Sequence, residues 1–343
     1  MVGVLGKRFF FSENEILEME RPRDVGCEIN NVCNATCSFC GYGKKNADLI
    51  GDPRRKSKLP ENVLEHTLRL YSEGGGGIFF LGPILGENTA DKRWLDFIRT
   101  ARSYDNITGV SCFTNGILLD KFGYDEILTS GLTNLTISTC LTSKRRYKEI
   151  YGVDEFDRVV TNILKLTQRN REMNYPVSIA LALRMDKPYK NFLESDLYNS
   201  LLENLKKNNI QILDDQWDDY RGLVKSENLP LGHIFKEGAV DKTRPCYALF
   251  RKLQVLMDGT IQACSCRVEP ELWVGNITEY DTLEAAWRNP KLEKLRNEWN
   301  LYGKLPKCCQ ECTHYIPFNS LISSKLRFVI VASKMILRKI IRK

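Results

Sequence analysis

Three closely spaced cysteines carry the clearest chemical signal in the chain. Cys33, Cys37 and Cys40 form a CxxxCxxC pattern on a loop that directly follows a predicted strand. Three thiolates on one short loop can each bind one iron of a cubane iron-sulfur cluster. The fourth iron then has no protein ligand and stays open to a substrate or cofactor, as at other catalytic metals. A zinc knuckle or free thiols are the alternatives. Zinc normally takes four ligands. No fourth Cys or His lies near this loop, since Cys27 is on the strand and His66 is far along the chain.

A second group of cysteines lies in the C-terminal part of the chain. Cys246 precedes a predicted hairpin, Cys264 ends it, and Cys309 and Cys312 form a CxxC pattern farther on. Four thiolates complete the coordination of a site, which suits either a fully ligated iron-sulfur cluster or a structural zinc ion. The N-terminal sequence lacks the apolar run of a signal peptide, so we expect a cytoplasmic protein. Cysteines in that compartment are more often metal ligands or catalytic groups than disulfide partners.

Strand and helix patterns alternate through the first two thirds of the chain. The predicted strands are 26–31, 77–81, 109–114, 135–140, 177–184 and 210–213. Helical patterns cover 60–73, 91–103, 154–168 and 191–207. This alternation predicts βα units around a parallel sheet, either open or closed into a barrel. In such folds the chemistry lies at the carboxyl ends of the strands, and the triple-cysteine loop begins at such an end.

The pattern changes after residue 220. Residues 222–243 have a mixed composition with Pro and Gly, which is typical of a linker. Residues 253–264 contain a hairpin signal around Asp258-Gly259. A small second domain is therefore predicted, and it holds half of the 12 cysteines.

The triple-cysteine loop, placed after the first strand of a βα series, resembles the radical SAM superfamily over residues 27–218. The resemblance implies a partial (β/α)6 TIM-like barrel. It also implies that S-adenosylmethionine binds the open iron of a [4Fe-4S] cluster and is cleaved to a 5′-deoxyadenosyl radical. The protein's part in such chemistry is to orient the cofactor and to exclude water.

Further positions match the superfamily's contacts with S-adenosylmethionine. The resemblance implies that Phe39 packs near the adenine, and that Gly86 and Glu87 correspond to the Gly-Gly-Glu stretch that contacts the methionine amino group. Leu85 and Asn88 depart from that pattern, so the assignment covers Gly86 and Glu87 only. The remaining matches are Asn115 in a Thr-Asn-Gly turn, Ser138 as a ribose contact and Arg184 as a carboxylate contact. Ordinary turns, core packing or a surface arginine would account for the same residues.

The C-terminal cysteines resemble the SPASM domain in its shortened form, often called Twitch, which holds one auxiliary [4Fe-4S] cluster. The resemblance assigns Cys246, Cys264, Cys309 and Cys312 as its ligands. Cys266 and Cys308 are additional, but two cysteines do not suffice for a second auxiliary cluster. The predicted domains are an N-terminal extension (1–26), the radical SAM core (27–222), a linker (223–245), the auxiliary-cluster domain (246–312) and a basic tail (313–343).

An auxiliary cluster suggests an electron acceptor, so the leading hypothesis is dehydrogenation of a small-molecule substrate. Aminocyclitol dehydrogenases with one Twitch cluster are similar in outline, and a reducing partner such as flavodoxin or ferredoxin is expected. One alternative is radical epimerisation with Cys140 or Cys266 as hydrogen donor. Modification of a ribosomal peptide is less consistent with the first 26 residues, which are too few for a peptide-gripping segment. A non-enzymatic iron-sulfur electron carrier is the remaining class.

The charge distribution separates the tail from the rest of the chain. The 343 residues carry a net charge of +7, and residues 313–343 contain seven Lys or Arg and no acid. The charges of residues 1–312 therefore sum to zero, which argues against a nucleic-acid partner. Residues 321–343 combine apolar and basic residues at helical spacing, which predicts an amphipathic helix. Such a helix suits either docking on its own protein or peripheral binding to an anionic membrane surface. If it binds a membrane, we expect a lipid-linked substrate.

Overall fold

The computed structural model describes most of the chain between residues 21 and 315. The described ranges are 21–22, 24–42, 58–82, 84–213, 217–220, 222–235, 242, 246–264, 269–313 and 315. Most of the predicted N-terminal extension, nearly all of the basic tail, and Cys266 lie outside these ranges. Among the described residues, no helix has both the length and the apolar character needed to cross a membrane.

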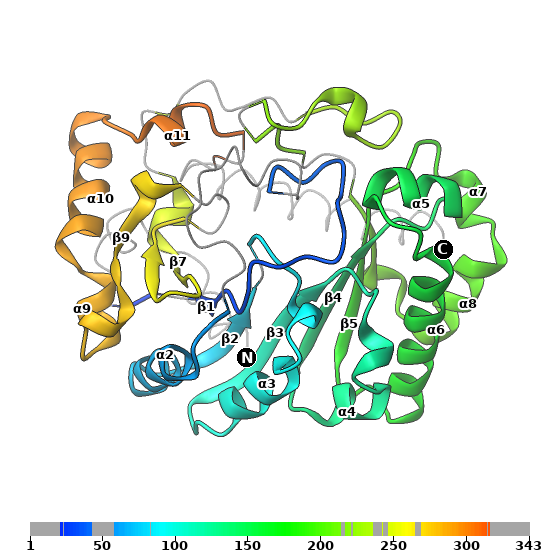
Figure 1. The fold of residues 1–343 in the computed structure, drawn as a ribbon, viewed down its shortest axis with the longest axis horizontal. Helices are drawn as coiled ribbons and strands as arrows, with labels where there is room; N and C mark the ends of the chain where they lie inside the picture. The colour runs from blue at the N-terminus through cyan, green and yellow to red at the C-terminus, as the bar shows by residue number, and fades with distance from the viewer. Residues whose placement is uncertain are drawn as a thin grey trace, which may run out of the picture.

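One twisted sheet forms the centre of the molecule (Figure 1). Its strands follow the order β6-β5-β4-β3-β2-β1-β7-β8-β9. The parallel strands are β1 (Asp24–Cys27), β2 (Gly77–Leu81), β3 (Ile107–Thr114), β4 (Asn134–Thr139), β5 (Ser178–Leu183), β6 (Ile210–Ile212) and β7 (Lys252–Val255). The antiparallel strands β8 (Thr260–Gln262) and β9 (Trp273–Asn276) continue from β7. The barrel is therefore partial, and the C-terminal hairpin extends its open sheet beside β1.

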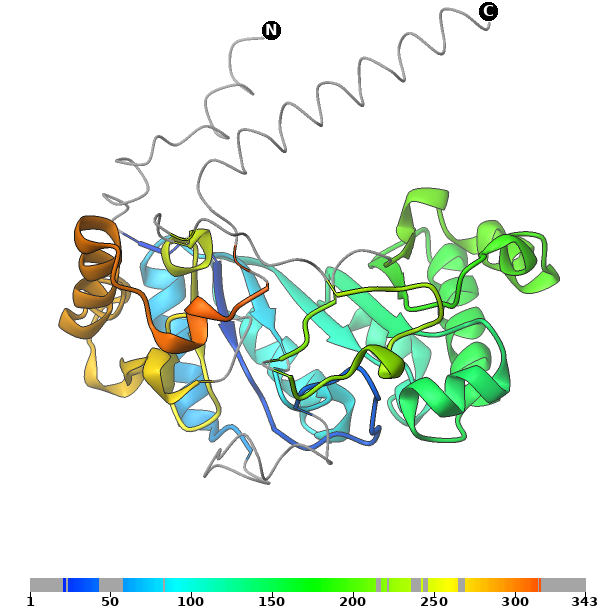
Figure 2. The same ribbon diagram turned by 90° about the horizontal axis from the view of Figure 1, so that it is seen from above.

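Helices follow the strands and cover the outer side of the sheet (Figures 1 and 2). In the first part of the chain they are α2 (Glu61–Glu73), α3 (Trp94–Arg102), α4 (Tyr124–Thr129), α5 (Lys144–Tyr151), α6 (Phe156–Glu172), α7 (Lys190–Leu193) and α8 (Asp196–Asn204). The C-terminal part adds α9 (Leu283–Trp287), α10 (Pro290–Tyr302) and α11 (Lys307–Gln310). Short 3-10 helices fill some connections, including Asn88–Ala90 and Tyr247–Phe250.

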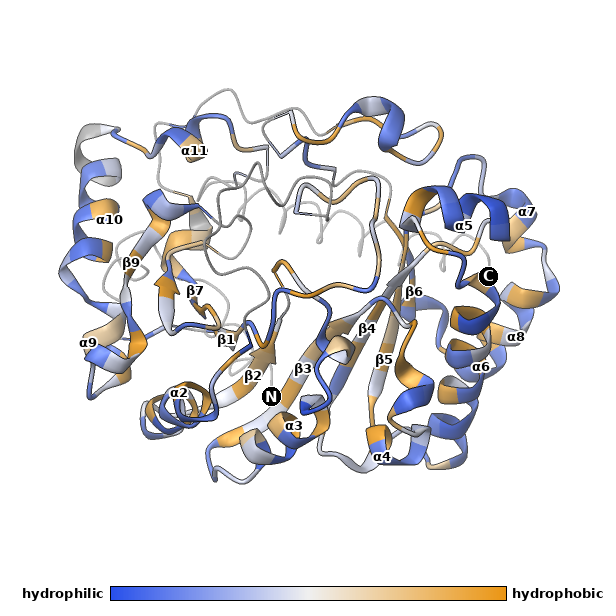
Figure 3. Cartoon of the chain, viewed as in Figure 1, coloured by the Kyte–Doolittle hydropathy of each residue, from blue (hydrophilic) through white to orange (hydrophobic). Residues whose placement is uncertain are grey.

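The core lies between the sheet and these helices. Helix α6 illustrates the pattern, because Val159, Ile163 and Leu166 are buried at intervals of three or four residues, as expected for one face of a helix. Apolar residues concentrate on the strands, whereas the outer helices carry many hydrophilic residues (Figure 3). This layering leaves the carboxyl ends of the parallel strands available for a site.

The structure confirms the predicted fold class and moves several element boundaries. Strand β1 ends at Cys27, so residues 28–31 of the predicted strand leave the sheet, although Glu28 N–H still donates to the carbonyl of Val255 at 2.9 Å. The sequence pattern predicts neither α4 nor α5, since both helices are too short to establish a long apolar period. The predicted domain boundaries stay a prediction. One sheet runs through both predicted domains, because β1 pairs with β7 and the sheet continues into the C-terminal hairpin.

Candidate functional site

The first site comprises Cys33, Cys37 and Cys40 on a loop that follows β1, at the carboxyl ends of the parallel strands (Figure 1). All three thiols are partly buried and line one cavity with about 880 Å³ of empty space. Burial, together with the neighbouring Cys40 and Cys33, raises the pKa of the Cys37 thiol. Gathered thiols of this kind suit positively charged iron, which stabilises them as thiolates.

Helix α5 holds this loop in place. Thr36 N–H donates to the carbonyl of Tyr151 at 3.0 Å, and Ser38 N–H donates to the carbonyl of Ile150 at 2.8 Å. Gly152 ends the helix with a φ of 70°, a conformation that glycine adopts without strain. A Cβ at Gly152 would lie 2.0 Å from the Thr36 hydroxyl, so the close approach of loop and helix requires glycine.

Glu87 joins the loop after β2 to the end of β3. Its carboxylate accepts hydrogen bonds from the Thr114 hydroxyl at 2.7 Å and from Asn115 N–H at 2.8 Å, and Thr89 donates through both its N–H and its hydroxyl. Burial raises the pKa of Glu87, although these hydrogen bonds act against the rise. Asn115 in turn donates to the side-chain oxygen of Asn34 on the cysteine loop at 2.7 Å. The Glu87 carboxylate therefore organises the wall of the cavity.

The other predicted contacts with S-adenosylmethionine gather at the same cavity. Phe39, Gly86, Glu87, Asn115 and Ser138 all line it. Gly86 is packed closely, because a Cβ there would lie 2.4 Å from the carbonyl oxygen of Asn30. The structure thus brings together five of the six predicted residues around the three thiols, and their roles stay a prediction.

Arg184, the sixth predicted contact, is not among the residues that line the cavity, but it contacts two residues that do. Its guanidinium bonds the Ser138 hydroxyl and lies over the Phe39 ring, 4.8 Å from the ring centroid. Phe39 also meets Tyr151 and Trp217 edge-on, with centroid distances of 5.6 and 5.3 Å. Arg184 is therefore placed to fix the orientation of Ser138 and Phe39.

The end of the predicted radical SAM core and the start of the predicted linker together complete the first site. We call residues 217–220 and 222–235 the strap, which runs beside the cysteine loop in both views (Figures 1 and 2). The Ser38 hydroxyl donates to the carbonyl of Asn228 at 2.7 Å, and Trp217 Nε1 donates to His233 Nδ1 at 2.8 Å. Sequence reasoning missed Trp217 and Tyr151, since their contacts form between segments that are distant in the chain.

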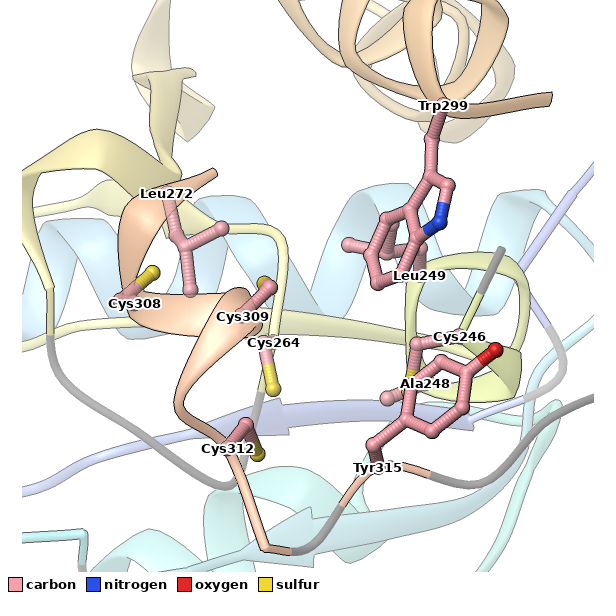
Figure 4. Close-up of a pocket in the computed structure, with 10 residues that line it drawn as sticks. All are labelled: Cys246, Ala248, Leu249, Cys264, Leu272, Trp299, Cys308, Cys309, Cys312 and Tyr315. Atoms are coloured by element: carbon pink, nitrogen blue, oxygen red, sulfur yellow. The ribbon is translucent and has the colours of Figure 1, made fainter. Parts of the chain in front are cut away.

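The second site comprises Cys246, Cys264, Cys309 and Cys312. Figure 4 shows the four thiols around one pocket, with about 420 Å³ of empty space. Trp299, Tyr315, Leu249 and Leu272 give the pocket apolar walls, and Cys308 lines it as well. A hydrogen bond with Cys308 and burial raise the pKa of the Cys309 thiol. As at the first site, a group of buried thiols fits bound iron.

The described residues contain no group of three or more His, Cys, Asp or Glu side chains arranged to hold a single metal ion. A cubane cluster distributes its thiolates over different irons, so it does not require them around one point. At each site, the thiols of one predicted ligand set line a single pocket.

The two candidate hydrogen donors are not placed alike. Cys140 is buried just beyond β4, and its thiol donates to the Thr142 hydroxyl at 3.6 Å. Ser138 and Tyr151 line the first cavity, but Cys140 is not among the described lining residues. Cys266 lies outside the described residues. The hydrogen-donor role of both cysteines stays a prediction.

Comparison with protein families gives two matches. The model of the radical SAM superfamily matches residues 27–179, and the model of the SPASM iron-sulfur cluster-binding domain matches residues 246–313. Together they match more than half of the chain, and each contains one of the two cysteine sites.

The chain is also similar to proteins named as GTP 3′,8-cyclases. The probable GTP 3′,8-cyclase of Sulfurisphaera tokodaii is 24% identical over 311 residues, which cover 81% of this chain and 91% of the relative. That of Pyrococcus abyssi is 28% identical over 155 residues, which cover 45% of each chain. The GTP 3′,8-cyclase of Staphylococcus aureus is 23% identical over 243 residues, covering 67% of this chain and 66% of the relative.

Solved structures share the fold at low sequence identity. SuiB of Streptococcus suis bound to precursor peptide SuiA has a TM-score of 0.58 at 14% identity, covering 86% of this chain and 70% of SuiB. BtrN in complex with AdoMet and 2-DOIA has a TM-score of 0.54 at 14% identity, covering 85% and 93%. The family matches and the two cysteine sites lead to one conclusion. This chain belongs to the radical SAM superfamily and carries a C-terminal SPASM-type domain, with S-adenosylmethionine, a [4Fe-4S] cluster and an auxiliary iron-sulfur cluster as its cofactors.

Proposed function

We propose that the chain is a radical SAM dehydrogenase that removes two electrons from a small-molecule substrate. The observation that carries the proposal is the second site, where four predicted ligand thiols line one pocket with apolar walls. Four protein ligands leave no open position, which suits electron transfer better than substrate binding. When bound, the cofactors supply a 5′-deoxyadenosyl radical at the first site and an electron-accepting cluster at the second.

The chain's own residues position these cofactors. Cys33, Cys37 and Cys40 would hold the first cluster, and Cys246, Cys264, Cys309 and Cys312 would hold the second. Glu87 orders the wall formed by Thr114 and Asn115, while Arg184 fixes Phe39 and Ser138. These contacts pre-organise the cavity, which reduces the entropy lost when cofactor and substrate bind.

In the proposed reaction the substrate loses one hydrogen atom, one proton and one electron. Together these equal two hydrogen atoms, as a two-electron oxidation requires. An alcohol carbon of the substrate would lose its hydrogen atom to the radical, the hydroxyl on that carbon would lose its proton to a base, and the remaining electron would go to the cluster at the second site, leaving a carbonyl. A one-electron carrier such as flavodoxin or ferredoxin supplies the electron that starts each turnover.

The test is a comparison of wild type with a Cys309→Ala/Cys312→Ala variant, both reconstituted anaerobically with iron and sulfide. Wild type should hold about eight irons and the variant about four, as expected for two cubane clusters. With substrate, wild type should release 5′-deoxyadenosine and a product two hydrogens lighter. The variant should still release 5′-deoxyadenosine without the oxidised product. Zinc at the second site, or a wild-type product of unchanged mass, contradicts the dehydrogenase proposal.

The names of the relatives support a second candidate, which is ring closure on a nucleotide. Proteins named GTP 3′,8-cyclase match up to 81% of this chain. GTP is therefore the first compound to test for stimulation of 5′-deoxyadenosine release. Release that depends on GTP, with closure of a ring in the product, favours this candidate over dehydrogenation. A product of inverted configuration would instead favour the epimerase alternative.

The predicted membrane contact concerns residues outside the described part of the chain. The basic tail would place the enzyme on an anionic surface and make a lipid-linked substrate accessible. Flotation with anionic liposomes should separate the full chain from one that ends at residue 317. Equal flotation of the two chains contradicts this role.

A further inference from the structure

Lys242 makes an unusual set of contacts beside the second site. Its ammonium donates to the carbonyl oxygens of Cys309 at 3.1 Å, Gln310 at 2.6 Å and Cys312 at 2.9 Å. A lysine ammonium has three N–H donors, so these three carbonyls use all of them. Two of the three belong to predicted ligands of the auxiliary cluster.

The position of these carbonyls explains why a cation fits there. They lie at the end of α11 and in the turn after it, where carbonyls no longer take part in a continuing helix. The Cys309 carbonyl also accepts the N–H of Cys312 at 3.3 Å, within the same CxxC turn. Carbonyl oxygens carry partial negative charge, so a compact ammonium stabilises them and fixes the direction of the chain through Cys312. The contacts thus set the shape of the CxxC turn.

The backbone of Lys242 ties the same turn to the aromatic wall of the pocket. Trp299 Nε1 donates to the carbonyl oxygen of Lys242 at 3.0 Å, and Trp299 stacks on Tyr315 with a centroid distance of 5.9 Å. The ammonium lies 5.8 Å from the centroid of Tyr315. One residue therefore connects the aromatic side of the pocket to its thiol side.

We propose that Lys242 is a positioning residue for the auxiliary cluster, and that its fixed charge raises the reduction potential there. Its contacts with Cys309 and Cys312 hold these residues in the orientation in which their thiols line the pocket. A positive charge bonded to the backbone of two ligand residues favours the state with one more electron, since local charge and hydrogen bonding tune cluster potentials. The inference rests on the proposed function in taking the second site as a redox cluster.

The experiment isolates the second site by placing each variant in a Cys33/Cys37/Cys40→Ala background. Lys242→Met removes the charge and the three hydrogen bonds at similar volume. Lys242→Arg keeps the charge, but its planar fork cannot direct three donors as an ammonium does. Lys307→Met is the matched control, because Lys307 lies exposed on the same short helix and loses an equal charge. The measurements are iron content after reconstitution and reduction potential from a titration followed by electron paramagnetic resonance.

We expect Lys242→Met to bind less iron, and the cluster that remains to have a more negative potential. Lys242→Arg should change the reduction potential less than it lowers the iron content. Lys307→Met should match the parent in both iron content and reduction potential. Equal iron and equal potential in Lys242→Met and the parent overturn the proposal. If Lys242→Met does not fold, the Lys242→Arg result decides: full iron content contradicts the positioning role.

A failure of the proposed function gives a different result. If the parent protein holds zinc at the second site, the electron-acceptor role fails while the positioning role is still measured. Lys242→Met should then lose zinc to a chelator faster than Lys307→Met, and equal rates of loss overturn the positioning role.

Discussion

The first site is built from one short loop, whereas the second is assembled from segments that are distant in the chain. Cys33, Cys37 and Cys40 lie between β1 and α2, but Cys246 and Cys264 flank a hairpin and meet Cys309 and Cys312 only after α10. The first cavity contains polar groups such as Asn115 and Ser138, while the second has aromatic and aliphatic walls. Under the proposed function, the first site would bind the reactive cofactor and the second would shield a redox centre.

The strap is where the two sites are connected. Near its start, Asp218 accepts a hydrogen bond from the hydroxyl of Thr313, the residue after Cys312, at 2.7 Å. Farther along, Asn228 accepts from Ser38 of the first loop at 2.7 Å. Each site nevertheless has its own support, since α5 holds the first loop and Lys242 holds the CxxC turn. The sites should therefore be separable by mutation.

The largest effect should come from Cys33/Cys37/Cys40→Ala. This variant should release no detectable 5′-deoxyadenosine, because it lacks every predicted ligand of the first cluster. It should keep about four irons at the second site. Cys112→Ala is a suitable control, because Cys112 is a buried cysteine that lines neither described cavity. Loss of all iron from the triple variant would show that the sites do not load independently.

A smaller effect, confined to the first site, is expected from Glu87→Gln. The amide places two donors where the carboxylate accepts hydrogen bonds from Thr114 and Asn115, so at least one buried donor loses its partner. An unsatisfied buried group costs about 1–3 kcal/mol. If the bound state bears that cost, S-adenosylmethionine binding weakens about 5- to 150-fold. Equilibrium binding measures this change.

Glu65→Gln is the control for Glu87→Gln, because Glu65 is exposed on α2. Iron content at the second site should not change in either variant. Unaltered affinity of Glu87→Gln for S-adenosylmethionine would show that Glu87 does not shape the cofactor cavity.

Acid should weaken one support of the first loop, the ion pair between Asp186 and Arg146. Asp186 accepts two hydrogen bonds from Arg146 of α5, at 2.6 and 2.9 Å, and one from Leu231 N–H of the strap at 2.7 Å. Burial opposes ionisation, but these hydrogen bonds hold the pKa of Asp186 below its ordinary value. The folded protein therefore binds this proton more weakly than the unfolded chain. The stabilisation is present above the unfolded pKa of about 3.9 and is lost as pH falls through the folded value.

Asp186→Asn tests this account in the metal-free protein. It should remove the contribution of Asp186 to the pH dependence and lower the free energy of unfolding by about 3 kcal/mol, as expected for breaking a largely buried pair. Hydrogen exchange should accelerate at Thr36 and Ser38 but not at Cys312. Asp157→Asn breaks an exposed pair with Lys144 and should have little effect. Equal exchange changes at both sites would contradict the separation.

Much of the first site could be predicted from the sequence because its information is local. The spacing of Cys33, Cys37 and Cys40 and their place after a strand identify the chemistry, and family motifs add Glu87 and Ser138. The pairing of β1 with β7 and the contact of Trp217 with Phe39 could not be predicted. Both join distant segments, and the strap has no periodic pattern that would indicate which face is buried.

The smallest effect should come from Trp217→Phe, which separates packing from hydrogen bonding in the strap. The phenyl ring keeps an aromatic contact with Phe39 but cannot donate to His233, so the loss should be about 1 kcal/mol of stability. Trp217→Ala removes the ring too and should cost about 3–5 kcal/mol. Thermal unfolding measures both variants, and affinity for S-adenosylmethionine should fall clearly only in Trp217→Ala. An equal cost for Phe and Ala would mean that the hydrogen bond, and not the ring, holds the strap on the first site. Loss of iron from the second site in Trp217→Phe would show that the strap couples the two sites more tightly than their separate supports indicate.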